Sequence, residues 1–186
     1  MPNLQAITPL GNKEPVTETY GPVTLTEITD IALASVSARL GREQDTAAAL
    51  ETFLGTPPPG AAEQCGNNLS AFWMGPDQWM IEAPFETHED LAARLVGTSP
   101  NAYSVTEQTD AWCRFDLKGP SLPDLFERLC AADTHAFTGG EAVRTSIEHL
   151  GCFVLCRTQN HFSVIGPRSS AGSLYHALVT AFRSVF

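Results

Sequence analysis

Cysteine and histidine are the residue types of this chain that most often form zinc sites in proteins. Cys152 and Cys156 are four positions apart in a segment whose apolar pattern predicts a β-strand. Four strand residues span about 13 Å, whereas one zinc ion requires both sulfurs at about 2.3 Å. This pair therefore cannot bind one ion, and the sequence contains no CxxC, HExxH or HxH spacing. We predict no metal site.

Nucleophilic and nucleotide chemistry have no complete motif either. The five histidines are scattered, and no GxSxG elbow accompanies them. Residues 138–141 (TGGE) lack the GK[ST] end of a phosphate loop, and no GxGxxG occurs. Residues 166–170 (GPRSS) precede a predicted helix whose N-terminus could favour an anion, but a serine N-cap explains them equally. We predict no catalytic and no cofactor-binding residue in this chain.

Composition narrows the classes of partner and compartment. The chain has 186 residues, 43% of them apolar, and 21 acidic against 11 basic side chains give a net charge of −10. Such a charge repels phosphate backbones and anionic lipid, so we expect neither nucleic acid nor membrane as a partner. The sequence has no signal-peptide pattern and no apolar run of about 20 residues. Five scattered cysteines fit a reducing compartment, which predicts a cytoplasmic protein.

Hydrophobic periodicity predicts alternating groups of strands and helices. Residues 1–22, rich in proline and glycine, are predicted to form an extended N-terminal arm that is disordered or laid across a partner. Strands are predicted at 23–40 (two, broken at Asp30), 69–74, 78–83, 103–107, 111–117, 142–147, 152–157 and 161–165. Asp45, a Thr87/Asp90 box and Ser121 with Asp124 are predicted to cap three helices, the first ending at Gly55, and 174–185 carry a fourth apolar stripe. Residues 56–68 are predicted to be an irregular loop.

An internal repeat suggests how these elements are organised. A shift of 83 positions aligns residues 79–84 with 162–167, together with the apolar positions of the helix that follows each strand. We therefore predict a single α+β domain at 23–186, built from two similar halves at about 23–100 and 101–186. Its antiparallel sheets should carry helices on one side. Chance similarity of two strand–helix units is the alternative.

One predicted strand places a tryptophan among charges. Alternation along residues 111–117 puts Cys113 and Phe115 on an apolar face and Trp112, Arg114 and Asp116 on the opposite face. Tryptophan and arginine are enriched at protein–protein contacts. Trp112 and Arg114 are therefore interface candidates, the alternative being that the chain's own loop or arm covers Trp112.

Five segments, taken together, resemble the gamma subunits of heterotetrameric sarcosine oxidases. They are residues 21–27 (GPVTLTE), 72–79 (FWMGPDQW), 109–112 (TDAW) with 117–120 (LKGP), 136–140 (AFTGG) with 144–145 (RT), and 168–169 (RS). The resemblance runs from about residue 22 to the C-terminus. It adds Arg168, which opens the last helix, as a third interface candidate.

The resemblance implies a subunit of an oxidoreductase complex in sarcosine catabolism and one-carbon metabolism. Such complexes oxidise sarcosine to glycine with formation of hydrogen peroxide, and the methyl carbon leaves as formaldehyde or methylenetetrahydrofolate. FAD, FMN, NAD and tetrahydrofolate are expected in the partner subunits, which are alpha, beta and delta. The gamma subunit resembles the folate-binding domain of aminomethyltransferases and is expected to be a non-catalytic assembly component, inactive alone.

Two other functions remain open at this point. One is a free-standing folate-binding one-carbon protein, although the chain lacks room for the further C-terminal domains of aminomethyltransferases and lacks the Lys-Gly-Cys-Tyr-type motif of related iron–sulfur assembly proteins. The other is an unrelated cytosolic adaptor, for which the argument from Trp112 serves equally well.

Overall fold

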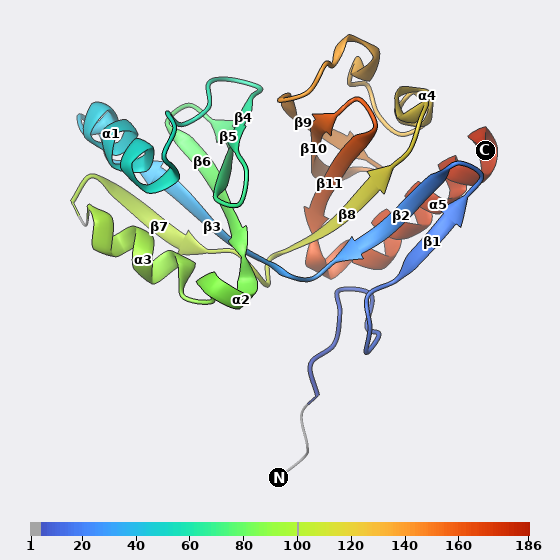
Figure 1. Ribbon diagram of the computed structural model, residues 1–186, viewed down its shortest axis with the longest axis horizontal. Helices are drawn as coiled ribbons and strands as arrows, with labels where there is room; N and C mark the ends of the chain where they lie inside the picture. The colour runs from blue at the N-terminus through green and yellow to red at the C-terminus, as the bar shows by residue number, and fades with distance from the viewer. Residues whose placement is uncertain (1–4, 100) are drawn as a thin grey trace. The chain divides into compact units, whose positions relative to one another are not determined.

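The computed structural model describes residues 5–99 and 101–186 and contains two β-sheets, each with its own helices (Figure 1). The chain divides into two compact units. Unit 1 comprises the residues up to Thr29, Asp110–Gly139 and Arg144–Phe186, and unit 2 comprises Asp30–Thr109 and Gly140–Val143. The predicted α+β class with antiparallel sheets is confirmed.

Unit 1 is built on a six-stranded sheet in the order β1-β2-β8-β11-β10-β9. The pairs β1–β2, β2–β8, β8–β11 and β10–β11 are antiparallel. The strands are β1 (Thr17–Tyr20), β2 (Val23–Ile28), β8 (Trp112–Lys118), β9 (Ala142–Ile147), β10 (Leu150–Thr158) and β11 (His161–Pro167). The helices are α4 (Leu122–Phe126), the 3-10 helices η1 (Thr134–Ala136) and η2 (Arg168–Ser170), and α5 (Ala171–Val185).

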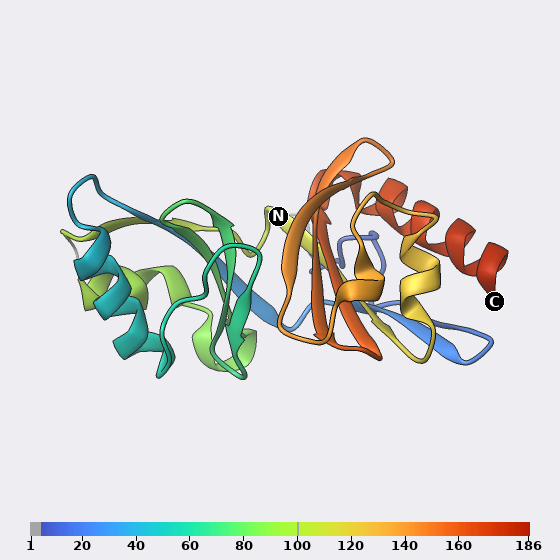
Figure 2. The ribbon, with the colours of Figure 1, turned by 90° about the horizontal axis from the view of Figure 1, so that it is seen from above.

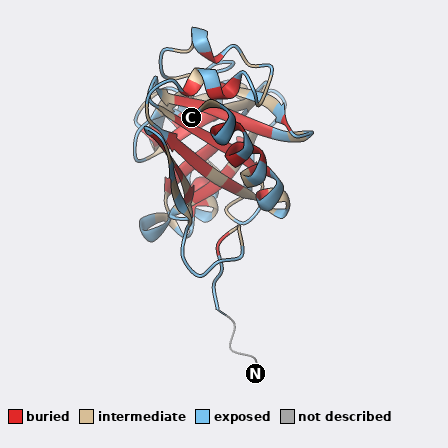
Figure 3. Cartoon of the chain, turned by 90° about the vertical axis from the view of Figure 1, so that its right-hand side faces the viewer, coloured by how far each residue is buried: buried red, intermediate tan, exposed pale blue. Residues whose placement is uncertain are grey.

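Helix α5 lies along one face of this sheet, as Figure 2 shows. Its predicted apolar stripe is buried, including Leu174, Leu178 and Phe182. Figure 3 shows that the strands beneath the helix are largely buried while its outer surface is exposed. Tyr20 of β1 stacks on Phe182, with ring centroids 5.0 Å apart. Helix α5 is therefore amphipathic and buries its apolar face against the sheet.

Unit 2 is built on a five-stranded sheet in the order β4-β5-β6-β3-β7. Its strands are β3 (Ile31–Ala38), β4 (Gln64–Gly66), β5 (Ser70–Gly75), β6 (Gln78–Pro84) and β7 (Tyr103–Glu107), and its helices are α1 (Glu43–Leu54), α2 (Phe85–His88) and α3 (Leu91–Thr98). Leu50, Leu91 and Leu95 of the helices join Ala34 and Ile81 of the strands in one buried core. No helix in the described part of the chain is long and apolar enough to cross a membrane.

The internal repeat has a structural counterpart. β6 and β11 each follow a hairpin partner, β5 or β10, and each ends in a proline that precedes a helical turn. Pro84 has φ −60° and ψ 126°, and Pro167 has φ −60° and ψ 128°. The fixed proline φ and an extended ψ thus give the same elbow in both units.

Asp90 and Ser121 occupy the N-cap positions of α3 and α4, whereas Asp45 does not cap α1, and none of these three helices has a side-chain cap hydrogen bond. Helix α1 begins at Glu43, and Asp45 lies in its first turn, where it pairs with Arg42 Nε at 2.5 Å. The Thr87/Asp90 segment divides into two helices without a side-chain cap, and Ser121 adopts a left-handed φ of 57°. After α4 the Arg128 and Leu129 N–H groups donate to carbonyls three residues back, as in a 3-10 turn, while the Cys130 N–H donates to the Phe126 carbonyl four residues back. Gly55, with φ 74°, ends α1 as predicted.

The predicted N-terminal arm and the predicted first half of the chain both contribute a strand to the sheet of unit 1. Residues 1–4 and residue 100 lie outside them. Within the arm, β1 pairs with β2, and β2 pairs with β8 of the second half of the chain. The predicted loop at 56–68 contains the short strand β4. The first β-hairpin therefore belongs to the sheet of unit 1, not to that of the half in which its sequence lies.

Candidate functional site

Trp112 lies in a cluster of aromatic and cationic side chains on unit 1, which we call the Trp112 patch (Trp112, Phe153 and Arg144). Trp112 is half-buried, and its ring centroid is 5.6 Å from that of buried Phe153, with the planes tilted by 59°. The guanidinium carbon of exposed Arg144 lies 5.8 Å from the same Phe153 centroid. A tryptophan and an arginine packed on one ring form a surface of the kind that protein interfaces favour.

Arg144 is a member of this patch that the sequence reasoning missed. It lies on β9, where exposed and less exposed residues alternate. A signal was present, because Arg144 belongs to the RT pair at 144–145 that helped carry the family resemblance. The contact itself joins β8, β10 and β9, and such long-range packing is not visible in a single sequence.

Arg114, the second predicted interface residue, is engaged within the chain. Its Nε lies 2.7 Å from Asp116 Oδ1 and its Nη2 lies 2.9 Å from Oδ2. Asp116 also accepts hydrogen bonds from Ser163 Oγ at 2.8 Å and pairs with His161 Nε2 at 2.9 Å. We call these four residues the Asp116 cluster. The Asp116 and Arg114 side chains are only 5% and 13% exposed, so the pair is nearly buried.

The charge on Asp116 is stabilised by its neighbours. Burial alone raises the pKa of this carboxyl, but the hydrogen bonds from His161, Arg114 and Ser163 and the charge of Arg114 outweigh it. The pKa of Asp116 is therefore held well below its ordinary range. A carboxylate that is ionised and bonded at both oxygens is a weak general base, which favours a structural role for the cluster.

Arg168, the third predicted interface residue, joins the N-terminal arm to the segment before β8. Its Nη2 donates to the Ile7 carbonyl at 3.1 Å, and its Nη1 lies 3.7 Å from Asp110 Oδ1. Its backbone N–H donates to the Ala111 carbonyl at 3.0 Å. The TDAW and RS segments of the resemblance thus meet in space. A cavity of about 490 Å³ opens here, lined by Ile7, Thr8, Pro9, Gly11, Asp110, Ala111, Arg168 and Ser169.

The arm is also anchored by a buried carboxylate. Glu27 of β2 is 2% exposed. Its Oε1 accepts the Leu10 N–H at 2.9 Å, and its Oε2 accepts the Val16 N–H at 3.1 Å. The segment from Leu10 to Val16 is therefore fixed to the sheet of unit 1 by two charge-assisted hydrogen bonds.

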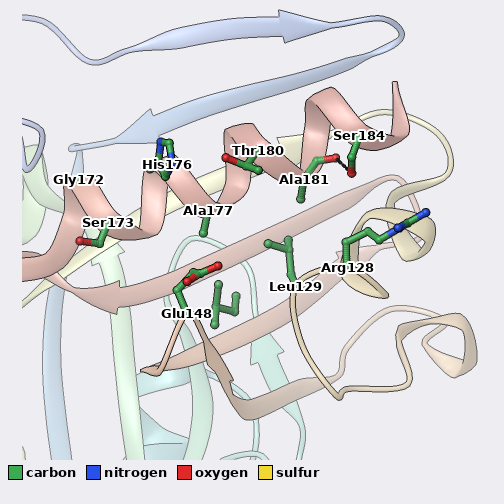
Figure 4. A pocket seen from close by; sticks show the side chains of 11 residues that line it. Arg128, Leu129, Glu148, Gly172, Ser173, His176, Ala177, Thr180, Ala181 and Ser184 are labelled. Atoms are coloured by element: carbon green, nitrogen blue, oxygen red, sulfur yellow. Dashed lines mark hydrogen bonds between the residues drawn. The ribbon is translucent and has the colours of Figure 1, made fainter.

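A second hollow runs beside α5, with a volume of about 690 Å³. Figure 4 shows Ala177 and Ala181 of the helix facing Leu129 and Glu148 across it. Its helix side consists mainly of small residues, and none of the three interface candidates lines it.

Two buried cysteines, Cys113 and Cys152, are not activated as nucleophiles. All five are free thiols. Burial raises the pKa of Cys113 to about 12 and that of Cys152 to about 11. Both thiols are therefore protonated near neutral pH, whereas a reactive cysteine requires a lowered pKa. No group of three or more His, Cys, Asp or Glu residues that could hold a metal ion occurs among the residues described.

Comparison with known proteins gives two curated relatives, while no family model matches the chain. A protein named sarcosine oxidase subunit gamma from Corynebacterium sp. (strain P-1) is 31% identical over 160 residues, covering 82% of this chain and 75% of that protein. A protein of the same name from Arthrobacter sp is 28% identical over 160 residues, covering 81% and 74%.

Two solved structures show the same fold. A chain of the heterotetrameric sarcosine oxidase from Corynebacterium sp. U-96 superposes with a TM-score of 0.74 at 21% identity, over 90% of this chain and 87% of that chain. The glycine cleavage system aminomethyltransferase T from Bartonella henselae gives a TM-score of 0.62 at 13% identity, over 85% and 45%.

Proposed function

The chain belongs to the sarcosine oxidase subunit gamma family, and from this membership we propose that it is a structural subunit of a heterotetrameric sarcosine oxidase. The observation that carries the proposal is the 31% identity over 82% of the chain. The resemblance inferred from the five sequence segments is thereby confirmed. A fold shared with a chain of a heterotetrameric sarcosine oxidase supports the same role.

The catalytic chemistry of the complex is proposed to lie in the other subunits. We expect FAD, FMN, NAD and tetrahydrofolate in or between the alpha and beta subunits, with delta completing the tetramer in the cytoplasm. Two features of this chain support an inactive role for it alone. The Asp116 carboxylate is committed to internal partners, and the Cys113 and Cys152 thiols are kept protonated by burial.

The docking surface is proposed to include the Trp112 patch and Arg168 with the arm segment that it holds. Both lie on unit 1. Trp112 is the strongest candidate because a half-buried tryptophan beside an exposed arginine can bury much additional area when a partner binds. Truncating such an anchor typically costs about 2 kcal/mol of binding free energy, roughly a thirtyfold loss of affinity. Arg114 is proposed to contribute only indirectly, through its ion pair with Asp116.

The test is co-expression of the tagged chain with its three partner subunits. Wild type should co-purify at one copy of each subunit, and the isolated chain should show neither flavin absorbance nor sarcosine oxidation. Trp112→Ala should weaken co-purification about thirtyfold while lowering the melting temperature of the isolated chain only slightly. Trp73→Ala, which truncates another half-buried tryptophan, is the matched control and should leave assembly unchanged. A flavin spectrum from the isolated chain would contradict the proposal.

A further inference from the structure

The connection between β3 and α1 presents one leucine entirely to solvent. Leu40 is 99% exposed, whereas the other exposed large apolar side chains of the described residues range from 37% for Phe186 to 59% for Ile7. Single exposed apolar residues are common on protein surfaces and need no explanation by themselves. The rigidity of the turn and the charges around it distinguish Leu40 from the others.

The turn that carries Leu40 is fixed by backbone hydrogen bonds. The Arg42 N–H donates to the Arg39 carbonyl at 2.8 Å, which closes a four-residue β-turn with Leu40 at its second position. Gly41, the third residue, has φ +77°, as a type II turn requires there. The Arg39 N–H donates to the Ala102 carbonyl at 3.0 Å, which ties the turn to the start of β7. Leu40 is therefore held outward before any partner arrives, and binding would require little further ordering.

Leu40 lies between two basic residues in an acidic unit, with Glu43 and Asp45 also close to the turn; Glu43 Oε1 accepts the Gly41 N–H at 2.9 Å. The residues of unit 2 include three basic side chains against twelve acidic ones, a net charge of −9. Two of the three basic residues, Arg39 and Arg42, flank Leu40. Arg42 pairs with Asp45 at 2.5 Å and Arg94 pairs with Asp90 at 2.6 Å. No ion pair of exposed Arg39 is found in the part of the chain that the structure describes.

We propose that Leu40, with Arg39 beside it, is a docking point for one of the larger subunits of the complex. The matching surface would be an apolar pocket with an acidic rim, since a leucine requires the first and a free guanidinium favours the second. A second copy of this chain is a poorer occupant, because two copies of charge −10 repel each other. This inference rests on the proposed function and adds a contact on unit 2 to those proposed on unit 1.

The test is a competition for limiting partner subunits within the full complex. Differently tagged wild-type and Leu40→Ser chains are co-expressed with the partners, and their ratio in the purified complex is measured. Burial of a leucine side chain in a partner predicts a loss of about ten- to a hundredfold for Leu40→Ser. Val96→Ser, which truncates a 46% exposed side chain of the same unit, is the control and should compete equally. Arg39→Glu should also compete poorly with wild type. Its disadvantage should be smaller at high salt, because salt screens the new repulsion between the introduced carboxylate and the acidic rim.

The outcomes separate the two proposals. If wild type fails to co-purify with the partners, the proposed function is overturned and this inference with it. If wild type assembles and Leu40→Ser competes equally, only the inference is overturned. A photo-crosslinker at position 40 should give an adduct with a larger subunit. An adduct formed only with another copy of this chain, or a dimer of the isolated chain that Leu40→Ser abolishes, would overturn the inference in favour of self-association.

Discussion

Replacing Asp116 by asparagine tests whether the Asp116 cluster stabilises unit 1. Asp116→Asn preserves the shape of the side chain but removes the charge that four hydrogen-bond contacts from Arg114, His161 and Ser163 converge on. The Arg114 guanidinium, 13% exposed, then loses its ion pair with Asp116. Removing one partner of a buried ion pair costs about 3–5 kcal/mol. The pair retains some exposure, so we expect the lower end of that range.

The expected loss can be measured on the isolated chain by urea denaturation and thermal melting. A loss of about 3 kcal/mol corresponds to a fall in melting temperature of about 6–12 °C for a chain of this size. Asp110→Asn is the control, because Asp110 is 88% exposed and 3.7 Å from Arg168. Exposed pairs contribute at most about 1 kcal/mol. The double variant Arg114→Met, Asp116→Asn should be more stable than Asp116→Asn alone, since it no longer contains a nearly buried cation that has lost its ion pair with Asp116.

The effect should also depend on pH in a defined direction. The pKa of Asp116 is lower in the folded chain than in the unfolded chain. Its contribution to stability is therefore fully present above the unfolded pKa of about 4 and is lost as the pH falls below it. The difference in unfolding free energy between wild type and Asp116→Asn should shrink as the pH falls from about 4 towards 3. A difference below 1 kcal/mol at pH 7, or one that does not change with pH, would refute the reasoning.

Two further predictions concern the contacts that fix the first hairpin and the arm. Gly119 has φ +145°, and a Cβ there would lie 2.6 Å from the Pro22 carbonyl oxygen, so Gly119→Ala should cost more than about 2 kcal/mol in urea denaturation. Gly172→Ala, where a Cβ meets nothing within 4 Å, should not destabilise the chain. Glu27→Gln replaces one of the two acceptors of the arm by a donor, so trypsin should cut after exposed Lys13 about tenfold faster. An unchanged cleavage rate would show that Glu27 does not anchor the arm.

The strands could be predicted from the sequence because their signals are local. Alternation over a few residues is enough to place β7 and β9, whose predicted bounds agree with the structure. The side-chain cap hydrogen bonds could not be predicted, because tertiary packing also sets the backbone conformation at the start of a helix. Ser121 has the residue type of an N-cap, but its left-handed conformation follows directly after the close approach of Gly119 to Pro22. That approach joins residues about a hundred positions apart, and no local pattern reports it.

The surroundings of the candidate site residues also depend on contacts between strands that are distant in the sequence. Alternation correctly placed Trp112, Arg114 and Asp116 on the face opposite Phe115, yet Asp116 is buried. Its partners His161 and Ser163 come from β11, which pairs with β8 across more than forty residues of sequence. A charged face on one strand can therefore be a buried polar network once its neighbour strand is known. The patch at Trp112 likewise required Arg144 from a third strand.

Several residues that carry the family resemblance hold the fold of this chain together. Thr109 Oγ1 accepts the Leu33 N–H at 3.0 Å. Gly119 permits the close approach of Pro22, and Trp79 Nε1 donates to the Pro59 carbonyl at 2.9 Å. These residues of the recognisable segments therefore help to fix the shape of the chain. Leu40 lies outside all five segments. A contact made by Leu40 would therefore be specific to this chain and its own partner subunits and would not be a feature by which the family is recognised.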